Sequence, residues 1–159
     1  MCDEPTSSLD VSIQAQIVHL LKELQEKIKL SYLFISHNLP VIHYLSEQIA
    51  VMYLGHIVEI GPREKIYNSP VHPYTKALLS SVFIPDPKVN KEKPKLTLFG
   101  ESPSPMHPPK GCVYSTRCAH ATKLCHSTKP EVKEVSQGHF VSCHYSNPIE
   151  AHHVTETNY

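Results

Sequence analysis

Two adjacent carboxylates, Asp3 and Glu4, stand at the start of the sequence, and a histidine, His37, follows a short apolar run. An aspartate can hold Mg²⁺, a glutamate beside it can orient and polarise a water molecule, and a histidine can reach a terminal phosphate. A strand–turn–helix order would place both carboxylates at the carboxyl end of a strand, where α/β folds bind ligands. The competing interpretation is that residues 3–10 are only a turn that caps a helix.

A second chemical group consists of four of the five cysteines, which follow a C-x5-C-x6-C-x17-C pattern: Cys112, Cys118, Cys125 and Cys143. Four thiolates in one short, loop-rich segment can build an all-thiolate metal site. The spacings of five and six residues are longer than those of common zinc sites, which favours an iron–sulfur cluster over zinc. The alternative is that these cysteines are buried small hydrophobic residues, and Cys2 is expected to be one.

Composition limits the classes of function. The formal net charge is zero, so electrostatics do not point to nucleic acid or to an anionic membrane surface. The apolar runs are well below the roughly 20 residues of a membrane span, and the first residues do not resemble a secretory signal. We therefore expect a cytoplasmic protein, in which cysteines bind metal more often than they form disulfides.

Periodicity predicts the elements that position these groups. Apolar residues at helical spacing predict an amphipathic helix over 11–28, with Asp10 as its N-cap. Residues 31–36 read as a buried strand that leads to His37. Further predictions are a helix over 40–46 capped by Asn38, strands over 48–54 and 57–60 joined by a Gly55-His56 turn, and helices over 63–68 and 73–82.

Most of the prolines lie after His72, and this distribution divides the chain. Residues 1–83 are expected to form an α/β domain, and residues 84–110 a proline-rich arm with a lysine-rich stretch at 88–95 and a short β-like run at 96–99. Residues 111–145 form the predicted cysteine-rich module, and residues 146–159 a polar, flexible tail.

Several blocks carry a resemblance to one family: CDEPTSSLDVSIQAQIVHLLKELQ, LFISHNLPVI, VMYLGHIVEIG, VHPYTKALLSSVFIPDP, SPSPMHPPKGC and the later RC. With them the sequence resembles the ATP-binding subunits of ABC transporters, specifically the second ATPase subunit of oligopeptide and dipeptide importers. The resemblance extends to about Tyr145. It implies a P-loop NTPase fold, present here as its C-terminal part, followed by the arm and the cysteine-rich module.

The resemblance also implies roles for individual residues. Asp3 matches the Walker B aspartate, which acts on Mg²⁺ through water, and Glu4 matches the catalytic glutamate. Ser8 and Asp10 match the D-loop, which crosses to the partner ATPase, and His37 matches the switch histidine that contacts the γ-phosphate. The cofactors would be ATP with Mg²⁺. The four cysteines match a C-terminal domain that holds a 4Fe–4S cluster in some members.

By the same resemblance, the partners would be a second ATPase subunit in a heterodimer, two membrane permeases and, indirectly, a peptide-binding protein, but no nucleic acid. The protein would be located at the cytoplasmic face of the membrane. The 159 residues contain no Gly-rich phosphate loop, Q-loop glutamine or signature motif. We therefore predict that this chain alone does not bind ATP, and whether it acts as an enzyme stays open. The alternatives are a non-catalytic metal-binding interaction module and the inactive product of a truncated gene.

Overall fold

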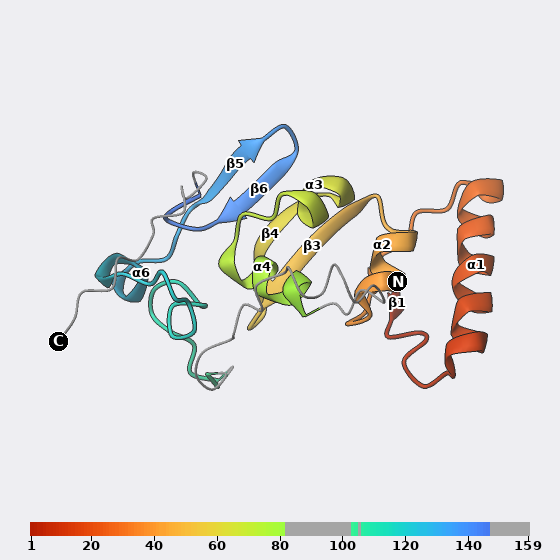
Figure 1. Cartoon of the computed structure of the whole chain (residues 1–159), viewed down its shortest axis with the longest axis horizontal. Coiled ribbons are helices and arrows are strands. Elements are labelled where there is room, and N and C mark those ends of the chain that lie inside the picture. The colour runs from red at the N-terminus through yellow and green to blue at the C-terminus, as the bar shows by residue number, and fades with distance from the viewer. Residues whose placement is uncertain (82–102, 105, 147–159) are drawn as a thin grey trace, which may run out of the picture. The chain divides into compact units, whose positions relative to one another are not determined.

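The computed structural model describes residues 1–81, 103–104 and 106–146 (Figure 1). The chain divides into two compact units, Met1–Ile49 and Ala50–Tyr159, which are described separately below. The predicted lysine-rich stretch at 88–95 and the β-like run at 96–99 lie outside the described residues. Among the described helices, none combines the length and the apolar character that crossing a bilayer requires.

The first unit contains the long helix α1, Val11–Ile28, with the predicted bounds. The Asp10 carboxylate caps it, accepting from the amides of Ser12 at 3.0 Å and Ile13 at 2.9 Å. This contact satisfies two amides of the first turn that have no partner inside the helix. The helix ends at Lys29, which adopts the left-handed conformation with φ of 52°.

Two short parallel strands flank α1 in the sequence: β1, Cys2–Asp3, precedes it, and β2, Phe34–Ile35, follows it. Cys2 pairs with Phe34, and Asp3 pairs with Ile35. The predicted strand over 31–36 is therefore too long, because β1 offers only two residues to pair with. It is also not buried, since Ile35 is 44% exposed.

The helix α2, Leu39–Leu45, follows the second strand, and Asn38 caps it by accepting from the Val41 amide at 3.3 Å. Its buried face meets α1 in a small apolar core. The core consists of Val18, Val41 and Leu45, with Leu21 and Phe34 packed against it. The helix and its cap confirm the prediction to within one residue.

The second unit is built on a four-stranded sheet with the order β3-β4-β6-β5. β3, Gln48–Tyr53, begins at the boundary between the units, and β4 spans His56–Pro62. Leu54 and Gly55 form the turn between them with φ of 47° and 76°. The prediction of a Gly55-His56 turn is wrong by one residue, because the two positive φ angles of this tight hairpin turn fall on Leu54 and Gly55.

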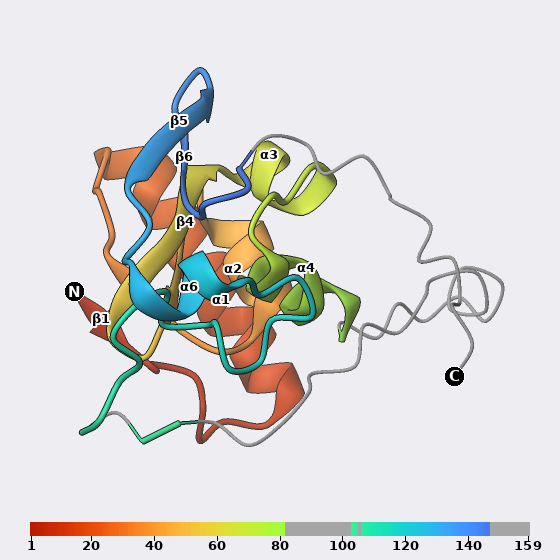
Figure 2. The ribbon, with the colours of Figure 1, turned by 90° about the vertical axis from the view of Figure 1, so that its left-hand side faces the viewer.

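The other two strands, β5 (Val132–Ser136) and β6 (His139–Ser142), form a hairpin beside β4 (Figure 2). β6 lies between β4 and β5 and is antiparallel to both. The sheet thus combines strands from both sides of the predicted arm. Of the predicted domain limits, the one at 83/84 falls outside the described residues.

Three helices are found among the described residues of the second unit: α3 (Arg63–Asn68), α4 (Pro73–Ser80) and α6 (Lys123–Ser127). α3 has the predicted bounds, and α4 ends at Ser80 rather than at the predicted residue 82. The Lys65 ammonium of α3 donates to Ser136 Oγ at 2.8 Å and to the Gln137 carbonyl at 3.0 Å. These contacts tie α3 to the turn of the β5–β6 hairpin.

Candidate functional site

Glu4 and His37 meet in the first unit, directly after the two paired strands. The Glu4 Oε1 atom lies 2.8 Å from His37 Nδ1 and accepts from the His37 backbone amide at 3.1 Å. The Glu4 side chain is 35% exposed and that of His37 is 82% exposed, so both can be reached from solvent. Because β1 and β2 are parallel, their carboxyl ends meet at one edge, and this brings two residues 33 positions apart together.

The backbone of Glu4 is held in an unusual conformation. Its φ of 44° lies in the left-handed region, which costs a residue with a side chain roughly 1–2 kcal/mol. The Glu4 amide donates to the Ile35 carbonyl at 2.9 Å, and the Glu4 carbonyl accepts from Ser7 Oγ at 3.0 Å. Strained backbone of this kind is concentrated at functional sites.

The other predicted site residues of this unit are placed around the same loop. Asp3 is an exposed residue of β1, and Ser8 is exposed in the loop that leads to α1. Asp10 caps α1, and the Ser12 hydroxyl, followed by the Ile13 amide, lowers the pKa of its carboxyl group. The structure therefore brings Glu4 and His37 into contact and uses Asp10 to begin the helix.

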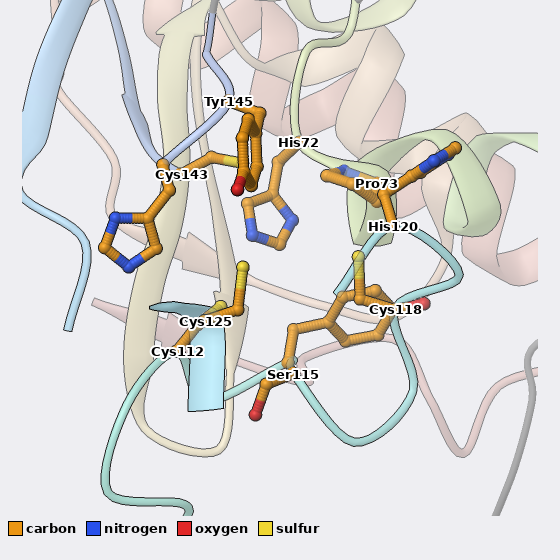
Figure 3. A pocket seen from close by; sticks show the side chains of 11 residues that line it. His72, Pro73, Cys112, Ser115, Cys118, His120, Cys125, Cys143 and Tyr145 are labelled. Atoms are coloured by element: carbon orange, nitrogen blue, oxygen red, sulfur yellow. The ribbon is translucent and has the colours of Figure 1, made fainter. Parts of the chain in front are cut away.

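The four predicted cysteine ligands lie in the second unit, and all of them line one small cavity (Figure 3). Cys112 and Cys125 are buried, while Cys118 and Cys143 are half-buried. They come from different elements: two loops, helix α6 and the segment after β6. The Cys112 amide donates to the Cys125 carbonyl at 2.7 Å, which joins two of these segments directly.

Burial raises the pKa of the thiols of Cys112, Cys118 and Cys143. At each of the three, a backbone amide two residues further on opposes this shift: Tyr114, His120 and Tyr145 respectively. A recurring amide at this position is suited to a sulfur that carries negative charge. The charges of neighbouring thiolates raise the pKa values of these three thiols further.

The donor set of this cavity can be compared with the known requirements of metal groups. Within the described part of the chain, no group of three or more Cys, His, Asp or Glu side chains is placed to hold a metal ion. A tetrahedral zinc ion needs its sulfurs about 3.8 Å apart, given a Zn–S bond of about 2.3 Å. In a 4Fe–4S cluster each cysteine binds a different iron, so the cysteine sulfurs are more widely spaced than those around one zinc ion. Four cysteine side chains around one cavity are the donor type that both an iron–sulfur cluster and a zinc ion use.

A buried polar network holds the segment next to this cavity. The Glu59 carboxylate, 1% exposed on β4, accepts from the amides of Val71 at 2.8 Å and His72 at 3.1 Å. His139 Nε2, on β6, lies 2.7 Å from Glu59 Oε1, and His139 is 2% exposed. Glu59 thus joins two strands to the start of α4.

His72 connects this network to the cysteines. It is 1% exposed, lines the cavity and caps α4, with Nδ1 accepting from the Tyr74 amide at 3.1 Å. Burial lowers the pKa of His72 to about 4. Its ring also packs against Tyr114, with ring centroids 5.7 Å apart.

The sequence alone did not single out His72, Glu59 or His139 as residues of a site. The Pro73 that follows His72 is a signal for the start of a helix, because proline suits the first helical position. Glu59 lies within an otherwise apolar strand, and a charged residue at such a place signals a buried partner. Its partner could not be read from spacing.

Comparison with known proteins supports the same assignment of family. Residues 58–125 match the model of the family described as "Oligopeptide/dipeptide transporter, C-terminal region". The chain is 52% identical over 149 residues to the oligopeptide transport ATP-binding protein OppF of Escherichia coli (strain K12), which is 94% of this chain and 44% of that protein.

Two further relatives extend this finding. The oligopeptide transport ATP-binding protein AppF of Bacillus subtilis (strain 168) is 49% identical over 91% of this chain and 44% of its own length. The di/tripeptide transport ATP-binding protein DppF of Pseudomonas aeruginosa (strain UCBPP-PA14) is 47% identical over 92% of this chain and 44% of its own length. The chain thus spans less than half of the relatives it matches. It is a homologue of peptide-transport ATP-binding proteins over 91–94% of its length and carries the C-terminal region of the oligopeptide/dipeptide transporter family.

Proposed function

We propose that this chain is part of an ATP-hydrolysing subunit of an importer for oligopeptides or dipeptides. The observation that supports this most directly is the contact of 2.8 Å between Glu4 Oε1 and His37 Nδ1 at the carboxyl ends of two parallel strands. A carboxylate and a histidine at that edge have the chemistry needed beside a γ-phosphate. The peptide-transport relatives supply the substrate class.

In this proposal each residue has a defined task. Glu4 orients the attacking water and accepts its proton. His37 uses Nδ1 to hold the Glu4 carboxylate, and its other ring nitrogen, Nε2, is the atom we assign to the γ-phosphate. Asp3 holds Mg²⁺ through a water molecule, and Ser8 and Asp10 face the second ATPase subunit. ATP and Mg²⁺ supply the phosphoanhydride bond and the charge neutralisation.

The phosphate cradle must come from polypeptide outside these 159 residues. Backbone amides of a Gly-rich loop and a lysine provide most of the affinity for nucleotide phosphates, and this sequence has no such loop. The first unit exposes apolar side chains that such a polypeptide could cover, among them Val11 at 82%, Leu33 at 63% and Ile28 at 59%. We therefore expect no ATP binding by this chain alone.

An exchange experiment tests the proposal. In E. coli OppF, the region that matches this chain is replaced by the whole chain, and oligopeptide uptake is measured in cells without native OppF. We expect uptake to be restored. Glu4→Gln should reduce ATP hydrolysis about 100-fold or more while ATP binding persists, because only the water-orienting group is lost. His37→Ala should reduce hydrolysis similarly.

The matched control is Glu47→Gln, which removes the charge of an exposed glutamate elsewhere in the first unit. It should leave uptake unchanged. If Glu4→Gln hydrolyses ATP as fast as the control does, the proposed role of Glu4 is wrong. Micromolar ATP affinity of the isolated chain would overturn the argument about the missing cradle.

The partners follow from the same proposal. A complete subunit would pair with a second ATPase subunit beneath two permeases at the cytoplasmic face of the membrane, and a peptide-binding protein would deliver the substrate. The relatives include transporters of oligopeptides and of di- and tripeptides. Transport assays with peptides of two to five residues in the exchange strain would show which length this chain supports.

The cysteine cavity supports a second assignment, a 4Fe–4S cluster held by Cys112, Cys118, Cys125 and Cys143. The supporting observation is that all four thiols line one cavity and that three of them face the amide two residues on. When bound, the cluster would supply cross-links between the segments that carry the cysteines. We assign it a structural role, since peptide transport needs no electron transfer. This assignment would also hold if the chain were only a non-catalytic interaction module.

Anaerobic purification of the whole chain tests this assignment through iron and sulfide analysis and visible absorbance. We expect about four irons per chain and a brown protein. Cys125→Ser should abolish the colour, and Cys2→Ser, in the first unit, should leave it unchanged. A colourless protein with one tightly bound zinc per chain would refute the cluster.

A further inference from the structure

The His72 ring lies among the cysteines, and this position has a chemical consequence. Figure 3 shows the ring between the sulfur of Cys143 and those of Cys118 and Cys125, and all four side chains line the same cavity. A buried imidazole carries two nitrogens, and each must be accounted for. One of them, Nδ1, is committed to the Tyr74 amide at 3.1 Å.

That contact fixes the tautomer of the ring. The Tyr74 amide is a donor, so His72 Nδ1 must be an acceptor and carry no proton. The ring is therefore neutral, and its single proton is on Nε2. As an N–H donor, Nε2 cannot bind a metal through a lone pair, but it can donate a hydrogen bond to an anionic sulfur.

The surroundings of His72 hold the ring in this orientation. Its backbone amide donates to the buried Glu59 carboxylate at 3.1 Å, and its face packs on Tyr114 with ring centroids 5.7 Å apart. The side chain is 1% exposed, so it meets little solvent. A donor held in place without access to water is worth more than the same donor at the surface.

A simpler interpretation is that His72 only caps α4. Ser, Asp or Asn would serve that purpose with a smaller side chain, and they are the residues most often found at helix N-caps. A cap requires only the Nδ1 position. It gives no role to the second nitrogen of a ring that lines a cavity containing four thiols.

We infer that His72 is a fifth functional residue of the cysteine site, whose Nε2–H donates a hydrogen bond to a sulfur of the iron–sulfur group or of its cysteine ligands. The inference rests on the cluster assignment above. Hydrogen bonds to the sulfurs favour the more negative, reduced state of such a group and raise its reduction potential. They also shield the sulfurs from oxidants.

Two substitutions separate the cap from the donor. In His72→Asn the side-chain oxygen replaces Nδ1 and keeps the cap, but the Nε2 donor is lost. In His72→Gln the longer amide carries an N–H near the Nε2 position, but the cap is lost. One variant therefore keeps the cap without the donor and the other keeps the donor without the cap, so each serves as the control of the other.

The test uses the whole chain reconstituted anaerobically with ferrous iron and sulfide. Two properties are measured: the midpoint potential of the group and the half-life of its visible absorbance in air. We expect His72→Asn to have a more negative potential and a several-fold shorter half-life, and His72→Gln to remain near the wild type. Hydrogen exchange of the Tyr74 amide should show the reverse order, with faster exchange in His72→Gln.

Each outcome is informative. If the wild type takes up no iron, the cluster assignment fails, and this inference fails with it. If the wild type binds the cluster and His72→Asn has the same potential and half-life, only the inference about His72 is overturned. If both variants change alike, His72 acts through capping or packing. If His72→Asn does not fold, a potential in His72→Gln unlike that of the wild type overturns the inference.

Discussion

Replacing Glu59 should destabilise the second unit far more than replacing an exposed glutamate. The Glu59 carboxylate accepts three hydrogen bonds from the Val71 amide, the His72 amide and His139 Nε2, at 2.8, 3.1 and 2.7 Å. Glu59→Ala leaves three donors without an acceptor, two of them on the buried residues His72 and His139 and one on the half-buried Val71, and each buried donor so left costs about 1–3 kcal/mol. Water entering the space would lower the sum, so we expect a loss of about 3–5 kcal/mol, as for other broken buried pairs.

The assay is denaturant unfolding of the whole chain combined with hydrogen exchange, which follows the two units separately. Exchange of the Val71 and His72 amides should accelerate most in Glu59→Ala, since these two lose their acceptor directly. Glu59→Gln keeps one acceptor oxygen and should cost about 1–3 kcal/mol. Glu131→Ala, at an exposed glutamate, is the control. Surface substitutions usually change the free energy of unfolding by less than about 0.5 kcal/mol. A Glu59→Ala protein whose free energy of unfolding lies within about that range of the wild-type value would refute the reasoning.

Three further predictions concern the N-cap of α1, the tight packing of Gly111 against the backbone of α6, and the buried face of β6. The pKa of the Asp10 carboxyl is lowered, so its capping of α1 stabilises the helix fully above the ordinary carboxyl pKa and is lost as pH falls through the lowered value. Acid titration of the Ser12 and Ile13 amide signals should therefore show a step, and Asp10→Ala should lack it. In Gly111→Ala the new Cβ would collide with the Cys125 carbonyl and lie 2.7 Å from the carbonyl carbon of His126, so unfolding free energy should fall by about 2–3 kcal/mol, whereas Lys110→Ala should be neutral. Val141→Ala, at 0% exposure in β6, should cost about 2 kcal/mol in thermal or chemical unfolding, and Val132→Ala, at 65% exposure in β5, should cost little; equal losses would contradict the assigned burial.

The elements that depend on local signals were predictable from the sequence. The helix over Val11–Ile28 and its cap Asp10 follow from apolar spacing and a capping side chain, and both are confirmed. The strand over 31–36 was predicted too long because its length depends on its partner, and β1 pairs with only Phe34 and Ile35. The β3–β4 turn shifted by one residue because Leu54 accepts a positive φ that its side chain disfavours.

The residues of the two candidate sites also differ in how far the sequence alone could identify them. The sequence suggested Glu4 and His37 because both follow strands, and the structure places them in contact. Their roles in hydrolysis stay predictions. The common cavity of the four cysteines was expected from their grouping, but the histidine among them was not. His72 reaches the cysteines only because Glu59 and the sheet hold its backbone, and such long-range contacts leave no pattern in the sequence.

The position of β6 between β4 and β5 has a consequence for synthesis on the ribosome. The contact between Glu59 and His139 cannot form until His139 has been synthesised, 80 residues further along the chain. At about 5–20 residues per second, β4 keeps an open edge, and the Glu59 carboxylate lacks its His139 partner, for about 4–16 s after the strand has been made. During this interval the nascent chain presents a strand edge to which other chains can add. We therefore expect chains stalled before residue 139 to be captured by chaperones or to aggregate, whereas chains that have released the β5–β6 hairpin close the sheet.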